Sequence, residues 1–134
     1  MRIKVAVAVI FDDEQRLLIT RRPWNKSYGG YWEFPGGKLE ENEDPKTALA
    51  RELQEEVGLL VITSQHLGDV LHDYTDSQVH LIVFAVHQFV GVPSCLESQL
   101  DLRWVKHDEL VDYQFPEANL KIIKRLNPNI PRLR

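Results

Sequence analysis

The apolar residues of this chain fall into runs separated by polar turns, and the period of each run predicts an element. Residues 3–11 and 78–90 are rich in β-branched side chains, which is typical of strands covered on both faces. Residues 16–20 and 101–105 predict two more strands, and the short polar turn after residue 11 favours a hairpin between 3–11 and 16–20. The run that starts at residue 60 becomes mixed, and Gly68 suggests a break in it.

A helical period occupies the segment between Asp44 and Gly58. The Asp44 side chain can cap the first turn, Pro45 suits the first helical position, and Gly58 can take the left-handed conformation that ends a helix. At about 100° per residue, apolar residues share one side of this helix, and they are Leu49, Ala50, Leu53 and Val57. Carboxylates gather in another arc, which is predicted to face solvent, and they are Glu52, Glu55 and Glu56.

The remaining segments read as loops and short helices. The composition of residues 23–31 and 91–100 predicts loops, a short helix is expected to open at residue 107, and an amphipathic helix is expected over 116–126. The tail from residue 127 to 134 contains two prolines and is expected to fray.

Composition limits the class of protein. With 134 residues and 43% hydrophobic content, a single domain over 1–134 is expected. The net charge of −4 argues against a surface that binds nucleic acid polymers. There is no apolar run near the roughly 20 residues that span a membrane, no signal peptide is visible, and Cys95 is the single cysteine. These features predict a soluble, cytoplasmic protein without a disulfide, and the spacing of the histidines makes a zinc site improbable.

The carboxylates of the helix carry the candidate chemistry. Glu52 and Glu56 are four residues apart and Glu55 lies between them, so their side chains are neighbours and repel one another. A solvated helix usually interleaves basic residues, and here only Arg51 intervenes. Oxygen ligands of this kind suit a hard cation, so we expect Mg²⁺, with Mn²⁺ as the alternative.

The spacing of glycines and charged residues around this helix resembles a known sequence motif. Gly37, then Glu43 after five residues, then the run 51–59 (Arg-Glu-Leu-Gln-Glu-Glu-Val-Gly-Leu) after seven more, matches every fixed position of the Nudix box. The chain therefore resembles the Nudix hydrolases. The resemblance implies an α/β fold, an α/β/α sandwich with a mixed β-sheet, and hydrolysis of a nucleoside diphosphate linked to another group.

The resemblance also assigns roles to residues. It implies that Glu52, Glu55 and Glu56 bind metal and take part in catalysis together with Glu97, and that the Gly36 carbonyl is a further metal ligand. Arg22 and Lys38 are expected to contact phosphate. Glu43 and Arg51 are expected to pair and hold the loop of the box against the helix.

Three further segments resemble the MutT-like Nudix proteins, which act on 8-oxo-dGTP. They are Thr20–Arg22, Trp32–Lys38 and Phe115–Asn119. The resemblance implies that Asn119 reads the base, since an amide can accept from the N7–H of oxidised guanine and donate to O6. Phe34, Asp76 and Ala118 are the other candidates for the base pocket.

The implied reaction is attack of water on the β-phosphorus, giving a nucleoside monophosphate and pyrophosphate. Two departures bear on the substrate, because Glu97 stands seven residues ahead of Trp104 instead of six and Ser77 stands where an arginine is common. A Nudix pyrophosphatase for CTP or 5-methyl-dCTP is therefore an alternative, and a nucleotide sensor without turnover is another. A monomer is expected.

Overall fold

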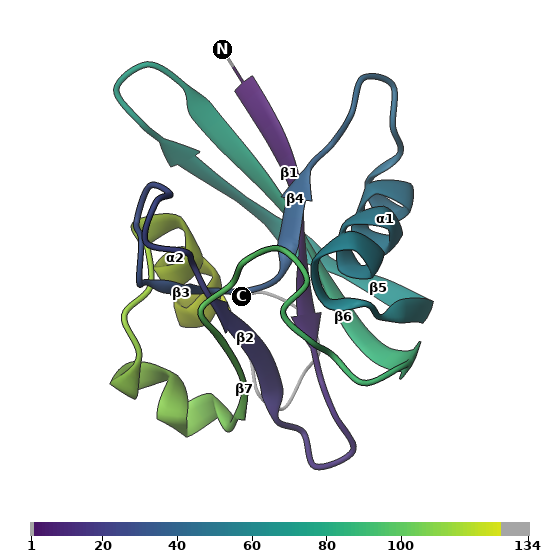
Figure 1. Ribbon diagram of the computed structural model, residues 1–134. Helices are drawn as coiled ribbons and strands as arrows, with labels where there is room; N and C mark the ends of the chain where they lie inside the picture. Colours follow the sequence, from purple (N-terminus) through teal and green to yellow (C-terminus); the bar gives the residue numbers. More distant parts are fainter. Residues whose placement is uncertain (1, 127–134) are drawn as a thin grey trace.

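The structure is a computed structural model, and it describes residues 2–126 (Figure 1). Four strands form the larger sheet in the order β4 (Gly36–Lys38), β1 (Arg2–Ile10), β6 (Gln78–Val90) and β5 (Leu60–Asp73). This sheet is mixed, because β1 runs parallel to β6 while the other pairs are antiparallel. The smaller sheet is antiparallel, with the order β3 (Trp32–Glu33), β2 (Leu17–Arg21) and β7 (Asp101–Val105).

Two helices cover opposite faces of the larger sheet, as Figure 1 shows for α1 (Pro45–Val57) and α2 (Glu117–Arg125). Alternate residues of β1 explain this arrangement, since successive side chains of a strand point to opposite faces. Ala6 and Ala8 pack in the cluster that contains α1, whereas Val7 and Val9 pack in the cluster that contains α2. The predicted α/β/α sandwich with a mixed sheet is confirmed.

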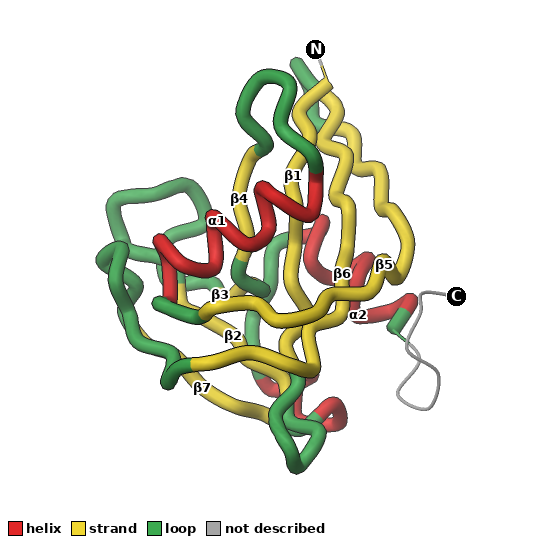
Figure 2. Tube along the Cα trace, turned by 90° about the vertical axis from the view of Figure 1, so that its right-hand side faces the viewer, coloured by secondary structure: helices red, strands yellow, loops and turns green. Residues whose placement is uncertain are grey.

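The predicted hairpin between the first two strands forms only at its turn, where the Asp12 N–H donates to the Arg16 carbonyl at 3.0 Å, and the two strands then join different sheets. In the larger sheet β6 pairs with β1 from Arg2 to Ile10, and β4 pairs with its other edge at Val5–Val7. The chain leaves this sheet after a single bridge between Phe11 and Leu17, and β2 pairs with β3 and β7 instead. Figure 2 shows the smaller sheet beside the larger one.

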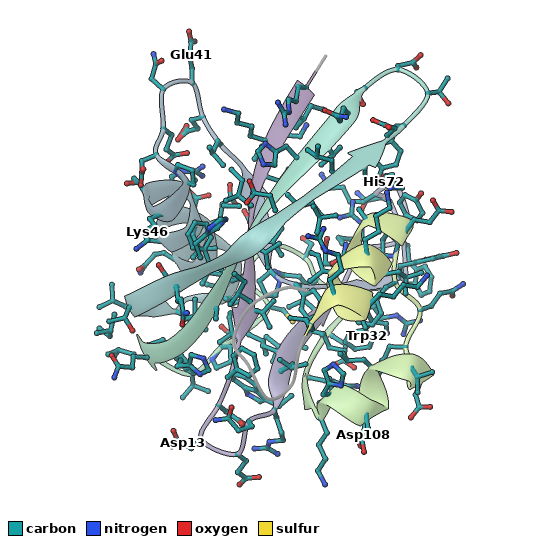
Figure 3. All side chains as sticks on the ribbon, turned by 180° about the vertical axis from the view of Figure 1, so that it is seen from behind. Asp13, Trp32, Glu41, Lys46, His72 and Asp108 are labelled. Carbon is teal, nitrogen blue, oxygen red and sulfur yellow. The ribbon has the colours of Figure 1, made fainter. Side chains whose placement is uncertain are left out.

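The strand β5 is continuous through the predicted break at Gly68. The register shifts between His66 and Gly68, which is a bulge in the ladder with β6 and not the end of a strand. Beside it, α2 packs against β5 (Figure 3). In this contact Lys121 Nζ donates to the Leu71 carbonyl at 3.3 Å. The tail expected to fray lies outside the described residues.

Local capping sets the ends of α1 as predicted. The Asp44 side chain accepts from the main-chain N–H groups of Lys46 and Thr47, and Gly58 ends the helix at φ 73°. The buried side differs in one place, because Ala48 is buried and Ala50 is exposed.

The other predicted helices also form. A 3₁₀ helix covers His107–Asp112, and α2 begins one residue after its expected start. Within residues 2–126, no helix has both the length and the apolar character needed to cross a membrane.

Candidate active site

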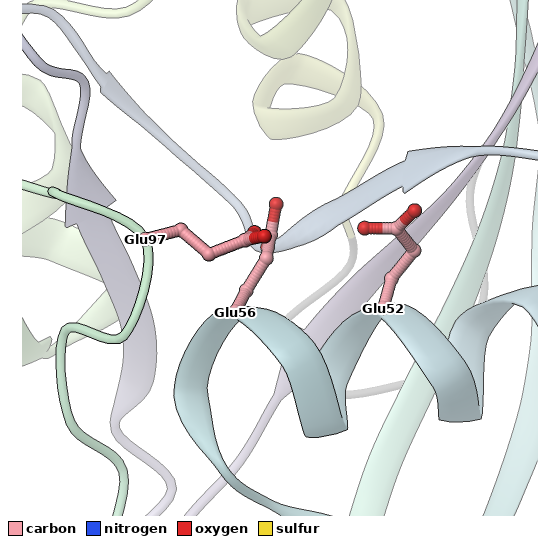
Figure 4. A group of neighbouring side chains, drawn as sticks. All are labelled: Glu52, Glu56 and Glu97. Carbon is pink, nitrogen blue, oxygen red and sulfur yellow. The ribbon is translucent and has the colours of Figure 1, made fainter.

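Three carboxylates meet where α1 faces the loop between β6 and β7. Glu52 and Glu56 lie on successive turns of α1, and Glu97 reaches toward them from the loop (Figure 4). One oxygen from each of the three residues lies within 4.8 Å of the others. The loop belongs to a part of the chain remote from α1, so the group is assembled only in the tertiary structure.

Glu55 does not join this group. Its side chain is 50% exposed and lies 3.4 Å from the Arg51 guanidinium. On a helix, residues four apart differ by about 40° in direction and neighbours by about 100°. Glu52 and Glu56 therefore point the same way, toward β4 and the loop, while Glu55 points to solvent.

Hydrogen bonds to the end of α1 fix the loop that carries Glu97. The main-chain N–H groups of Ser94 and Leu96 donate to the carbonyls of Val57 and Glu56, at 3.0 and 3.1 Å. These are carbonyls that the end of a helix leaves unpaired. The green segment after β6 in Figure 1 accordingly runs between α1 and the smaller sheet.

Gln99 ties the same loop to the helix through its side chain. Its Nε2 donates to the Glu56 carbonyl at 2.9 Å, and its Oε1 accepts from the Glu97 main-chain N–H at 2.8 Å. The longer spacing between Glu97 and Trp104 therefore still brings Glu97 to the carboxylates of α1.

The carboxylate group has the electrostatics of a cation site. Burial raises the pKa of Glu56 to about 8, although the Gly36 N–H that donates to it at 3.0 Å acts in the opposite direction. The charges of Glu33, Glu52 and Glu97 raise it further. Burial also raises the pKa of Glu52. A hard divalent cation would neutralise these oxygens, so the residues present fit such an ion.

Two glycines let β4 approach the carboxylates closely. A Cβ on Gly37 would overlap the carboxylate of Glu52, and a Cβ on Gly36 would overlap the carbonyl oxygen of Ala6 in β1. The clash at Gly36 is with main chain, so only glycine fits there, whereas a Cβ at Gly37 would push the Glu52 carboxylate aside.

A bidentate ion pair holds the loop before α1 against the helix. Arg51 Nε and Nη2 donate to the two Glu43 oxygens at 2.8 and 2.9 Å, and this bonding lowers the pKa of Glu43 to about 2. The same guanidinium donates to Glu52 at 2.9 Å and to the Lys38 carbonyl at 3.2 Å. It therefore links the loop, β4 and one carboxylate of the group.

Two cavities lie beside the carboxylates. The first, of about 530 Å³, is mostly apolar and is lined from β1, β4, β6 and α2 by residues that include Val5, Leu81, Phe34, Ala118 and Asn119. The second, of about 310 Å³, is polar, and its lining comprises Thr20, Arg22, Pro23, Lys26, Glu33, Glu56, Glu97 and Gln99. The second cavity thus contains part of the carboxylate group, and we call the two the apolar cavity and the polar cavity.

Asn119 has a fixed orientation in the apolar cavity. Its Oδ1 accepts from the Phe34 main-chain N–H at 3.1 Å. Because a main-chain N–H can only donate, this bond places the carbonyl oxygen of the amide toward Phe34 and leaves the NH₂ group for another partner.

The comparisons with known proteins agree with this geometry. The sequence matches the NUDIX domain over residues 6–125. This chain belongs to the Nudix hydrolase family. It is 44% identical over 88 residues to an 8-oxo-dGTP diphosphatase of Proteus vulgaris, covering 66% of this chain and 79% of that protein. It is 34% identical over 128 residues to an 8-oxo-dGTP diphosphatase of Escherichia coli, covering 93% and 96% of the two proteins.

Solved structures agree as well. A structure of MutT, from work on Aliivibrio salmonicida and Vibrio cholerae, is 38% identical with a TM-score of 0.79, over 92% of this chain and 95% of that one. A MutT Nudix hydrolase from Burkholderia pseudomallei is 26% identical with a TM-score of 0.85, over 95% and 99%. This protein is thus a Nudix hydrolase of the MutT type, and Nudix hydrolases generally use a divalent metal.

Some residues expected to serve this Nudix site lie apart from the cavities. Asp76 is exposed in the turn between β5 and β6 and does not line the apolar cavity, whereas its neighbour Ser77 does. The Lys38 side chain is exposed at the end of β4 and lines neither cavity.

Two charged residues that line the cavities were not predicted from the sequence, Glu33 and Lys26. Glu33 lines both cavities and accepts from Arg22 Nη1 at 2.8 Å, and Lys26 lines the polar cavity. The alternation of a strand could have indicated Glu33, because the buried Trp32 and Phe34 on either side direct it to the opposite face. Lys26 lies in a loop, where no sequence period reports direction.

Proposed function

We propose that this Nudix hydrolase converts 8-oxo-dGTP to 8-oxo-dGMP and pyrophosphate with Mg²⁺, and so removes an oxidised nucleotide from the pool before DNA synthesis. The observation that supports the substrate is the oriented amide of Asn119 in the apolar cavity, beside the Phe34 main chain. The proposal treats residues 1–134 as a single Nudix domain acting as a monomer.

The proposed base contact follows from the chemistry of the amide. The NH₂ group of Asn119 donates to O6 of the purine, and the second lone pair of Oδ1 accepts from N7–H, which oxidised guanine has and guanine lacks. With unmodified guanine that acceptor faces a lone pair, which costs about 1–3 kcal/mol in a buried site. Phe34 and Ala118 line the same cavity and pack against the base. Asp76 stays a prediction for the edge of the base.

The polar cavity is the proposed place of the phosphates. Arg22 lines both cavities, so it stands where a nucleotide would pass from one to the other. Its guanidinium already donates to Glu33 and to the Ser27 carbonyl, and a phosphate there would compete for these donors. Lys38 stays a prediction, because its side chain would have to reach the phosphates from the end of β4.

The proposed metal ligands are Glu52, Glu56 and Glu97, with the Gly36 carbonyl beside them. A bound Mg²⁺ would supply positive charge to the phosphate oxygens and lower the pKa of a coordinated water. Glu97, the most exposed of the three carboxylates, is suited to accept the proton of the water that attacks the β-phosphorus. Glu55 stays a predicted ligand that would need a second ion, since it lies outside the group.

A second candidate substrate is a cytosine nucleotide. The chain is 29% identical over 124 residues to a CTP pyrophosphohydrolase of Escherichia coli, covering 92% of this chain and 90% of that protein. Ser77, a small side chain, lines the apolar cavity where the family often has an arginine, and the change would alter the edge that meets the base.

The test is kcat/KM at fixed Mg²⁺ for 8-oxo-dGTP, dGTP, CTP and 5-methyl-dCTP, with released pyrophosphate as the readout. We expect a preference for 8-oxo-dGTP that arises mainly in KM. A preference for a cytosine nucleotide would overturn the assignment of the base and leave the Nudix chemistry in place. Binding of all four without pyrophosphate release would indicate a nucleotide sensor.

A further inference from the structure

The loop between β2 and β3 is closed by its own hydrogen bonds. The main-chain N–H of Arg22 donates to the Tyr31 carbonyl at 2.8 Å, and the N–H of Gly30 donates to the Arg22 carbonyl at 2.9 Å. Inside the loop, Arg22 Nε donates to the Ser27 carbonyl at 2.7 Å, and the Lys26 N–H donates to the Pro23 carbonyl at 3.2 Å. A loop with this many internal bonds holds a defined shape beside the cavities.

Arg21 and Trp24 attach the same loop to the smaller sheet. The Arg21 guanidinium lies 5.2 Å from the centre of the Trp24 ring and 5.8 Å from that of Trp32, and its Nε donates to the Gly30 carbonyl at 2.7 Å. The Trp24 ring folds over Gly30, where a Cβ would overlap it. Because cations are attracted to aromatic faces, Arg21 joins the loop to the buried Trp32.

This loop delivers Lys26 to the polar cavity. Among the described residues that line this cavity, two are basic, and Arg22 is one of them, already bonded to Glu33 and Ser27. Lys26 is the other, and its ammonium group has no hydrogen-bond or ion-pair partner within residues 2–126. Two carboxylates of the metal group, Glu56 and Glu97, line the same cavity.

The cavities that Lys26 does and does not line indicate which part of a bound nucleotide it would meet. Arg22 and Glu33 line both cavities and so mark the passage between them, whereas Lys26 lines only the polar one. A nucleoside in the apolar cavity would pass its first phosphate by Arg22 and place the later phosphates near Lys26. An ammonium group without a partner is a ready donor to phosphate oxygens.

We propose that Lys26 binds the terminal phosphate of the substrate. It thereby makes this enzyme select a nucleoside triphosphate over a nucleoside diphosphate, whether that diphosphate is free or joined to a neutral group. The proposal rests on the function proposed above only for the direction of the nucleotide, with its base in the apolar cavity. The proposed role of Lys26 does not depend on which base is bound, so the test compares nucleotides that carry the same base and different numbers of phosphates.

The experiment measures, at fixed Mg²⁺, the Michaelis constant of the oxidised triphosphate (8-oxo-dGTP) and the inhibition constants of the matching diphosphate and monophosphate. If the assay of the four nucleotides selects CTP, the same series of cytidine phosphates is used. For Lys26→Ala we expect the Michaelis constant of the triphosphate to rise about 5- to 20-fold, as for loss of one charge-assisted bond at a solvated site. The inhibition constant of the monophosphate should stay within about twofold, because it does not extend to Lys26.

Two further variants separate charge from loop structure. Lys26→Arg keeps the charge and should retain most of the triphosphate affinity. Lys46→Ala removes an equal charge from the exposed first turn of α1, outside both cavities, and should leave the whole series unchanged. Equal losses for mono- and triphosphate in Lys26→Ala would mean that the loop had changed shape, and an unchanged Michaelis constant would mean that Lys26 binds no phosphate. Either result overturns the proposal.

Discussion

Replacing Glu56 by glutamine should stabilise the metal-free protein while it abolishes turnover. Glu56 is held near two other carboxylates, and its pKa of about 8 lies well above the ordinary 4.5. Between these values the folded state binds a proton that the unfolded state has lost, so the stability of the metal-free wild type should fall as pH rises through this window. Glutamine does not titrate and avoids this penalty.

The size of the effect follows from the pKa. One pKa unit corresponds to about 1.4 kcal/mol. At pH 7 the raised pKa of Glu56 therefore lowers the free energy of unfolding by at most about 3 kcal/mol. Relaxation of the side chain and entry of water reduce this figure, so we expect Glu56→Gln to gain about 1–3 kcal/mol near pH 7 and less than about 1 kcal/mol near pH 5.

The assay is urea unfolding, followed by tryptophan fluorescence, in chelator and in excess Mg²⁺ at both pH values. In Mg²⁺ the wild type should gain stability and the variant should gain less, because a ligand stabilises only the state that binds it. Pyrophosphate release by Glu56→Gln should fall by at least about 100-fold.

Glu55→Gln is the matched control. Its carboxylate is exposed and, within residues 2–126, pairs with Arg51 alone, so the free energy of unfolding should change by no more than about 0.5 kcal/mol. If metal-free Glu56→Gln is less stable than the wild type near pH 7, or shows the same dependence on pH, the electrostatic account of this site is wrong.

Three other changes test other parts of the site. Gly37→Ala should lower Mg²⁺ affinity about 10- to 100-fold, measured by metal titration, because its Cβ would displace the Glu52 carboxylate; unchanged affinity would contradict Glu52 as a ligand. Gln99→Ala should lower kcat about 10-fold with little change in Tm, since it frees the loop of Glu97, and an unchanged kcat would show that this tether is not needed. Asn119→Ala should remove the preference for 8-oxo-dGTP over dGTP, about 10-fold or more in kcat/KM, and a retained preference would place base reading elsewhere.

Structural features that depend on residues close together in the chain were predicted correctly from the sequence. The ends of α1 depend on Asp44 and Gly58, which act within one turn of the helix, and the structure has both as predicted. The strand Gln78–Val90 and the strand Asp101–Val105 also have their predicted bounds, because burial on one or both faces leaves a local pattern. The Nudix box is a continuous motif and identified the family in the same way.

Tertiary packing decided which other segments of the chain lie next to these helices and strands. The sequence did not show that β1 would use both edges within the larger sheet and leave β2 to a second one, since strand pairing between distant segments leaves no local period. It predicted that Glu52, Glu55 and Glu56 face solvent together, whereas in the structure Glu52 and Glu56 are partly buried beside Glu97 and only Glu55 of the three stays exposed. Which helical side chains meet depends on where β4 and the loop of Glu97 lie, and no local pattern reports that.

The same limit applies to the cations of the site. Lys38 is next to the box in the sequence, yet its side chain lies outside both cavities, while Lys26 lies in a loop without any motif and lines the polar cavity. The hydrogen bonds that shape this loop, and the contact of Arg21 with Trp24, exist only in the folded chain. The sequence alone thus determined α1, the bounds of β6 and β7 and the family of the box, whereas β3 and β4 were not predicted. The tertiary structure decided which strands pair and which side chains share a cavity, because both depend on contacts between segments far apart in the chain.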